Sequence, residues 1–165
     1  MGRNRVVSGA SLAAESSPRA KPIRFPVLSF SRDGLVLALD SLEPISRCTK
    51  LGFKNGFYNG LILVDSDRFR HRVAHARRVR TLPPTRFRDV LDLLTGNTRW
   101  QVEFIFDPGS TLVSLEEVKS LFSSSFKENA MEWEEVTDFE RFRDQTMHAS
   151  SMEEIFAAFR AANLV

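Results

Sequence analysis

The chain has 165 residues, of which 42% are hydrophobic and 27% are charged, and 14 of them are Phe. This length and composition suit one compact domain with an apolar core and exclude a wholly disordered protein. The single cysteine, Cys48, excludes an internal disulfide or a cysteine-based metal cluster and indicates a reducing compartment, so we expect a cytoplasmic location. No apolar run approaches the ~18 residues that a membrane span requires, so we expect no membrane partner.

The net charge of +2 conceals a strong asymmetry along the chain. Residues 1–100 contain 18 Lys and Arg against 8 Asp and Glu, a net charge of +10, whereas residues 101–165 contain 5 against 13, a net charge of −8. Such polarity bears on partners and association rather than on fold. Either the two halves neutralise each other within the molecule, or they face solvent and attract a charged partner.

Residues 1–24 are predicted to form a disordered N-terminal arm before a single α+β domain at 25–165. The arm contains five Lys and Arg against one acid and is otherwise rich in Ser, Ala and Gly. This composition predicts a flexible tail. It also occurs in organelle transit peptides, an alternative that the sequence leaves open.

The sheet is predicted to begin with a hairpin. Residues 27–31 and 35–39 are short apolar runs separated by Arg-Asp-Gly, and Asp-Gly favours a tight turn. Residues 45–51 are predicted to form a third strand. Residues 52–60 contain two Asn-Gly pairs, which favour turn geometry and predict a hairpin. The alternative is a binding loop, in which the aromatic residues among these glycines make a contact surface.

A further hairpin follows. The apolar run at 61–64 predicts a central strand, and Asp65-Ser66-Asp67 turns the chain into the alternating strand that begins at Phe69. A helix is predicted between a Thr85 cap and Gly96. Residues 100–106 then alternate as a half-buried strand.

The last third of the chain is predicted to be helical. Three Ser/Thr-x-x-Glu capping boxes, at 114–117, 137–140 and 151–154, mark helix starts, and each is followed by apolar residues at helical spacing. The sequence therefore predicts an α+β fold: a mostly antiparallel sheet of about five to six strands with one inserted helix, followed by about three C-terminal helices.

Two patterns were considered as metal sites. His71 and His75 have the spacing of zinc ligands on a helix, but the alternation around them predicts a strand, on which the rings lie roughly 13 Å apart. Asp65 and Asp67 have no third acid close in sequence, so we predict a turn there rather than an ion site. We therefore expect no metal and no cofactor.

No catalytic residue is predicted. A Gly-x-Ser-x-Gly elbow does not occur, and Cys48 lies in an apolar run in which Arg47 and Lys50 are the close positive charges. The sequence thus favours a non-catalytic protein, with an enzyme that lacks a recognisable motif as an alternative.

Eight arginines lie between residues 68 and 88, with no acid among them. Such a group suits the phosphates of a nucleic acid, an acidic protein surface or the acidic C-terminal helices of the same chain. No RNP-type aromatic motif, Gly-x-x-Gly loop or zinc finger accompanies it, which counts against nucleic acid. If the strand alternates regularly from residue 68, one face carries the predicted arginine stripe of Arg68, Arg70, Arg72, Arg78 and Arg80.

An acidic cluster surrounds Trp133 and includes Glu134 and Glu135. Acids in the first turn of a helix are favoured by the helix dipole, which accounts for part of the cluster. An aromatic anchor among acids also suits a surface that covers a basic site. We predict that these three residues, like the arginine stripe, bind a partner.

The missing catalytic constellation and the segregated charge predict a non-catalytic cytoplasmic protein that binds a partner protein. This organisation is similar to that of small bacterial α+β proteins that bind one partner, such as immunity proteins that neutralise toxins, and a regulatory role fits equally. A nucleic-acid-binding protein that uses the arginine stripe is the second hypothesis.

Overall fold

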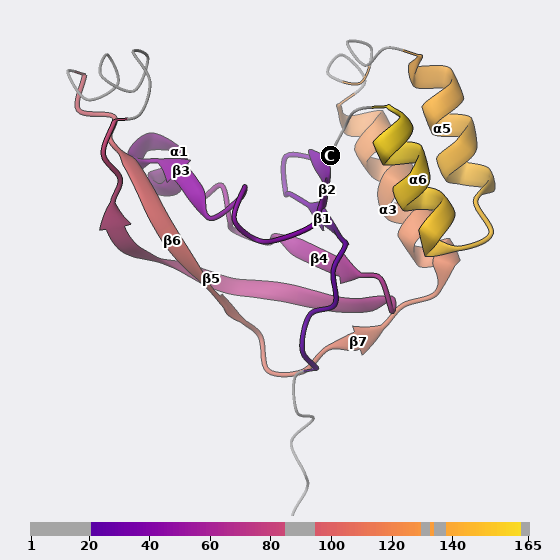
Figure 1. Ribbon diagram of the computed structural model, residues 1–165, viewed down its shortest axis with the longest axis horizontal. Helices are drawn as coiled ribbons and strands as arrows, with labels where there is room; N and C mark the ends of the chain where they lie inside the picture. The colour runs from indigo at the N-terminus through magenta and orange to yellow at the C-terminus, as the bar shows by residue number, and fades with distance from the viewer. Residues whose placement is uncertain (1–20, 85–94, 130–132, 134–137, 163–165) are drawn as a thin grey trace, which may run out of the picture.

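The structure is a computed structural model and describes residues 21–84, 95–129, 133 and 138–162. A curled antiparallel sheet carries the helices of the C-terminal third beside one end, and a short helix lies near its other end (Figure 1). This arrangement confirms the predicted α+β class. None of the helices in the described part is long and apolar enough to cross a membrane.

The elements of the described residues have the following bounds. The strands are β1 Val27–Phe30, β2 Val36–Leu39, β3 Arg47–Thr49, β4 Ile62–Asp65, β5 Phe69–Thr81, β6 Arg99–Phe106 and β7 Thr111–Leu112. The helices are α1 Lys50–Lys54, α3 Leu115–Glu128, α5 Phe139–His148 and α6 Met152–Ala161.

The strands are ordered β2-β1-β4-β5-β6-β3, and β7 pairs with the beginning of β5. Two of the predicted hairpins are confirmed, because β1 pairs with β2 and β4 pairs with β5 in antiparallel register. The first turn depends on Gly34, whose φ of 78° is a left-handed conformation that glycine adopts without strain. The predicted strand at 100–106 is also confirmed, as β6.

The region from 45 to 60 matches its prediction only in part. Residues 55–60 form turns, as predicted, but β3 pairs with β6 rather than with β4, so the expected hairpin is absent from the described strands. The expected strand at 45–51 is shortened to β3, because the Thr49 hydroxyl accepts the N–H of Gly52 at 3.0 Å and so begins α1. The aromatic residues that follow do not form a contact surface: Tyr58 is buried, and Phe53 and Phe57 pack against the core.

Two other predictions fall wholly or partly outside the described residues. The helix expected between Thr85 and Gly96 corresponds to residues 85–94, which lie outside them. Residues 1–20 of the predicted arm also lie outside the described residues, whereas Lys21 and Arg24 contact the folded chain.

The helix starts follow the predicted capping boxes to different degrees. At α3, Ser114 and Glu117 satisfy each other's backbone N–H groups, as predicted. At α6, Ser151 caps the helix, but the Glu154 carboxylate accepts from Ser150 instead. The helix α5 begins after Asp138, which makes no side-chain cap bond; the predicted cap, residue 137, lies outside the described part.

Two apolar clusters lie on opposite faces of the sheet. The first joins β1, β2 and β4 to the C-terminal helices around the fully buried Phe122 and Phe159. The second lies around Tyr58, Leu63 and Val102. Because consecutive strand residues point to opposite faces, all four residues of β1 are buried. Within the described part of the chain, the far half of β5, which carries Arg77, Arg78 and Arg80, is not covered on both faces in this way.

Candidate functional site

The arginines lie on β5, a strand of 13 residues. Its first half pairs with β4 and its second half with β6. Two register shifts interrupt the pairing with β6, one between Val73 and His75 and one between Arg78 and Arg80. A bulge inserts an unpaired residue and so changes which face the following side chains share.

The register shows on which face of the sheet each arginine lies, because residues directly opposite each other on two antiparallel strands point to the same face. Gln101, Glu103 and Ile105 of β6 alternate along one face, and their partners on β5 are Arg80, Arg77 and His75. Arg72 belongs to this face too, since the next residue, Val73, lies opposite Phe106 on the other one. We define the basic face as Arg70, Arg72, His75, Arg77 and Arg80.

The predicted arginine stripe is therefore wrong at two members and incomplete. Arg68 precedes β5 in a left-handed turn, with a φ of 67°. Arg78 lies opposite the buried Val102, with its guanidinium 4.6 Å from the centroid of the Trp100 ring. The two bulges reverse the alternation, so Arg77 replaces Arg78 beside Arg80.

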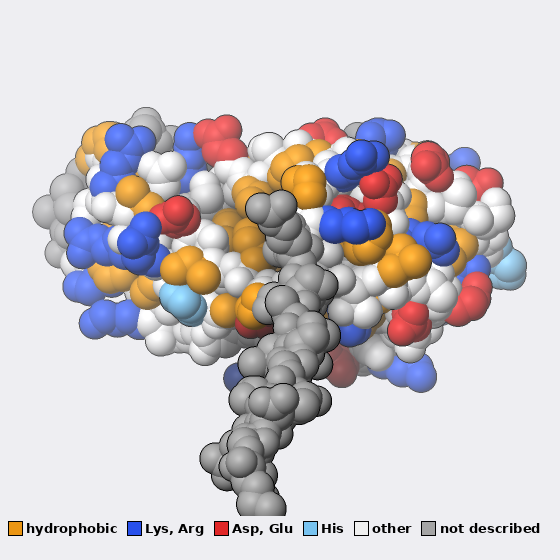
Figure 2. Space-filling model, turned by 90° about the horizontal axis from the view of Figure 1, so that it is seen from below, with side chains coloured by type: hydrophobic (Ala, Val, Ile, Leu, Met, Phe, Trp, Pro, Cys, Tyr) orange, Lys and Arg blue, Asp and Glu red, His pale blue; other side chains and the backbone are white. Residues whose placement is uncertain are grey.

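The charges of the basic face are exposed and paired locally. The Arg77 guanidinium lies 2.6 Å from the Glu103 carboxylate, and the Nε of Arg80 donates to the Gln101 side-chain oxygen at 2.7 Å. Ile105, an exposed apolar residue, follows Glu103 on the same face of β6 and lies opposite His75. Figure 2 shows Lys and Arg side chains gathered toward the left end, where β5 and β6 lie in Figure 1, around a few apolar and acidic side chains.

The acids of the C-terminal helices do not neutralise this face through the ion pairs found in the described part. The nearest electrostatic link is from Arg70 to Glu117, where hydrogen bonds from Ser114 chiefly, and Arg70 to a lesser degree, lower the pKa of the carboxyl. The ion pairs that acids at α3 and α5 do form are with cations of the same segment: Glu116 with Lys119 at 3.0 Å, Asp138 with Arg141 at 3.7 Å and Glu140 with Arg143 at 2.5 Å.

The predicted anchor of the acidic cluster, Trp133, is a core residue. It is 5% exposed and stacks on Phe139 and Phe142, with ring centroids 5.9 and 5.6 Å apart. Its indole N–H donates to the Ser125 hydroxyl at 3.2 Å, which satisfies the polar atom inside the core. This burial leaves little of the Trp133 ring for a partner to contact, and a role for Trp133 in binding stays a prediction. Glu134 and Glu135 lie outside the described residues.

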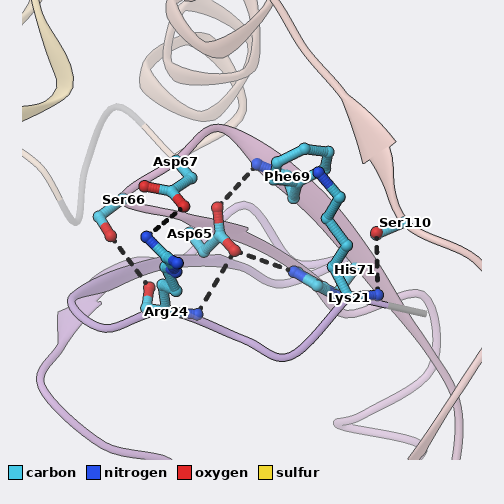
Figure 3. A network of polar contacts seen from close by, with 8 residues as sticks. All are labelled: Lys21, Arg24, Asp65, Ser66, Asp67, Phe69, His71 and Ser110. Atoms are coloured by element: carbon cyan, nitrogen blue, oxygen red, sulfur yellow. Dashed lines mark hydrogen bonds and ion pairs between the residues drawn. The ribbon is translucent and has the colours of Figure 1, made fainter. Parts of the chain in front are cut away.

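A buried Asp65–His71 pair is the polar feature that sequence reasoning missed (Figure 3). The two side chains are 1% and 4% exposed, and the Nε2 of His71 lies 3.2 Å from an Asp65 oxygen. The carboxylate also accepts the N–H of Phe69 at 2.7 Å and of Arg24 at 3.4 Å. Asp65 thus attaches the segment before β1 to the β4–β5 turn, which is a structural role.

The strand prediction for the two histidines is confirmed, because His71 and His75 both lie on β5. They occupy opposite faces, with His71 buried and His75 exposed on the basic face. Among the residues that the structure describes, no group of three or more His, Cys, Asp or Glu side chains could hold a metal ion.

Cys48 does not have the character of a nucleophile. Burial raises the pKa of its thiol, which favours the unreactive neutral form, although a hydrogen bond with Tyr58 partly opposes this shift. The Tyr58 hydroxyl donates to the Ile45 carbonyl oxygen at 2.6 Å, and burial raises the pKa of Tyr58 well above its ordinary range. Both groups are neutral at physiological pH and belong to the second apolar cluster.

Comparisons with models of protein families, with curated proteins and with solved structures find no match for this chain. The function therefore has to be inferred from the residues of the candidate site. The basic face supplies exposed guanidinium groups around an apolar residue, and such an arrangement suits recognition of an anionic surface rather than bond making or breaking.

Proposed function

We propose that this chain is a non-catalytic protein that binds an acidic surface of a partner protein through its basic face, in a toxin-neutralising (immunity-type) or regulatory role. The observation that carries the proposal is the basic face itself. Four arginines and His75 share one side of β5 and are exposed, and the ion pairs formed by acids described at α3 and α5 are with other cations.

The composition of the face favours a protein over a nucleic acid. Its cations are arginines, which are enriched in protein interfaces, and lysines are depleted there. Ile105 adds an exposed apolar contact at its centre. Glu103 and Asp107, which pair with Arg77 and Arg72, lower the net positive charge of the face, on which binding to a phosphate backbone chiefly depends.

The groups that could suggest catalysis have structural partners, which supports a binding role. Asp65 and His71 are buried together under the β4–β5 turn, and Cys48 is kept neutral beside Tyr58. A catalytic acid, base or nucleophile has to reach its substrate. Asp65, His71 and Tyr58 are buried, and Cys48 is only partly exposed.

The test compares two variants that each lose two positive charges from exposed ion pairs or hydrogen bonds. The first is Arg77→Gln with Arg80→Gln on the basic face, and the matched control is Arg141→Gln with Arg143→Gln on α5. Each tagged protein is incubated with native lysate, and the retained proteins are identified by mass spectrometry.

We expect one acidic protein to be retained in stoichiometric amount by the unmodified chain and the control, and to be lost by the basic-face variant. Equal retention by both variants, or retention of no protein, would contradict the proposal. Nuclease-sensitive retention of nucleic acid that weakens steeply with salt would favour the nucleic-acid alternative.

A further inference from the structure

The basic face becomes concave where it approaches α3. Strand β6 ends at Phe106, and the chain turns away through Asp107 before it returns as β7 to pair with Arg70. This departure leaves a pocket of about 440 Å³ beside β5. Its lining residues are Gly60, Ile62, Arg70, Arg72, Asp107, Pro108, Gly109 and Thr111.

Two guanidinium groups dominate the pocket. Arg70 lies opposite Val64 and Thr111, and Arg72 lies opposite Ile62, so both side chains are on the basic face. Residues two apart on a strand are separated by about 7 Å, a spacing from which two flexible arginine side chains can converge on one anion.

The two arginines differ in what they already contact. Arg70 makes no side-chain hydrogen bond or ion pair with the residues that the structure describes. Arg72 contacts the Asp107 carboxylate, but at 3.9 Å between Nε and oxygen, which is longer than a hydrogen bond. Among the described residues, the pocket therefore holds one guanidinium without a hydrogen bond or ion pair, which interacts with Glu117 only at longer range, and one that is weakly paired with a carboxylate.

We propose that this pocket receives an Asp or Glu side chain of the partner, with its carboxylate held between Arg70 and Arg72. The inference rests on the proposed function and names the anchor point within the basic face. Ile62 supplies apolar surface for the methylene groups of the incoming side chain. Asp107 lies where it competes with the ligand for Arg72, and its charge disfavours a phosphate, which carries more negative charge than a carboxylate.

The test uses a short capped oligoglutamate peptide as the probe and an oligoglutamine peptide of equal length as the control. Binding is followed by NMR through the side-chain Nε–H signals of the arginines. We expect oligoglutamate to shift the signals of Arg70 and Arg72 most, and oligoglutamine to leave them unchanged. Inorganic phosphate that shifts these signals more than oligoglutamate does would overturn the carboxylate assignment.

Three substitutions separate a specific pocket from diffuse attraction. Arg70→Gln should weaken the affinity for oligoglutamate roughly tenfold, as expected for the loss of a charged hydrogen-bond donor. Arg80→Gln, with the same change in charge outside the pocket, should weaken it less than about twofold. Asp107→Asn removes the internal competitor and should strengthen it. Equal losses at Arg70 and Arg80, or weaker binding by Asp107→Asn, would overturn the inference.

The pocket and the proposed function can fail separately. If Arg70→Gln leaves the peptide affinity unchanged while Arg77→Gln with Arg80→Gln still loses the partner, the pocket inference fails and the proposed function stands. If Arg70→Gln weakens peptide binding selectively while no partner depends on the basic face, the carboxylate pocket stands and the proposed function fails. Far-UV circular dichroism of each variant verifies that it is folded.

Discussion

Replacing Asp65 by Asn is expected to destabilise the fold strongly, although it changes only one oxygen to an NH2 group. Both carboxylate oxygens of Asp65 are in use (Figure 3). One accepts the N–H of Phe69 at 2.7 Å, and the other faces the N–H of Arg24 at 3.4 Å and the Nε2 of His71 at 3.2 Å. Because a carboxylate only accepts, Nε2 carries the proton in this contact.

The magnitude follows from what an amide can replace. If the side-chain oxygen of the Asp65→Asn variant accepts the N–H of Phe69, its NH2 group faces the N–H of Arg24 and, while the imidazole keeps its proton on Nε2, the N–H of His71 as well. A hydrogen bond to a charged group contributes about 1.5–3 kcal/mol, and the Arg24 contact is long enough to count for little. Adding the desolvation cost of an unpaired buried imidazole N–H, we expect a loss of about 3 kcal/mol in the free energy of unfolding.

The assay is urea unfolding followed by tryptophan fluorescence. If the free energy of unfolding falls by about 2 kcal/mol for each molar of urea, the urea concentration at the unfolding midpoint should fall by about 1.5 M. Asp67→Asn is the matched control, because the Asp67–Arg24 pair at 3.1 Å has side chains 44% and 69% exposed and should contribute less than about 1 kcal/mol. Similar midpoint shifts in the two variants would refute a buried, structural role for Asp65.

Three further predictions concern other parts of the molecule. Ser125→Ala should lower the free energy of unfolding, measured in urea, by about 2–4 kcal/mol, because the hydroxyl donates to the buried Gly34 carbonyl and accepts from Trp133. A loss below about 1 kcal/mol would contradict this role of the hydroxyl. Hydrogen bonds from its cap lower the pKa of Glu117 below 4.5, so its stabilisation is present at neutral pH and lost as the pH falls through the lowered value. The thermal midpoints of the protein and of Glu117→Gln should therefore differ at neutral pH and converge in acid; a constant difference argues against this cap. Burial raises the pKa of Cys48, so a thiol reagent should modify it more slowly in the folded protein than in urea, and equal rates would be inconsistent with its burial.

The fold was largely predictable because its signals are local. Asp-Gly at the first turn and the apolar alternation on either side of it predict β1 and β2 and their pairing. The Ser114–Glu117 box likewise marks the start of α3. Local signals were insufficient where two structures compete: Thr49 belongs to a predicted strand, but its hydroxyl caps a helix by accepting from the residue three positions on.

The site was less predictable, because its composition depends on contacts between distant segments. Whether Trp133 is a surface anchor or a core residue depends on the helix that brings Phe139 and Phe142 against it. The buried pair of Asp65 with His71 requires the β4–β5 turn to bring together side chains from two strands. No spacing rule along the chain encodes either contact.

The faces of β5 illustrate the same limit and also bear on how the basic face works. A regular strand would place Arg78 and Arg80 together, but the bulges pair Arg77 with Glu103 and Arg80 with Gln101 on one face. The ion pair of Arg77 with Glu103 removes part of the net charge, and both cross-strand bonds restrain long side chains that would otherwise lose rotamer entropy on binding. Restrained arginines bind a matching acidic surface at a smaller entropic cost than free ones. Local pairing on β5 and β6 therefore favours specific recognition over diffuse attraction, as a partner-binding role requires.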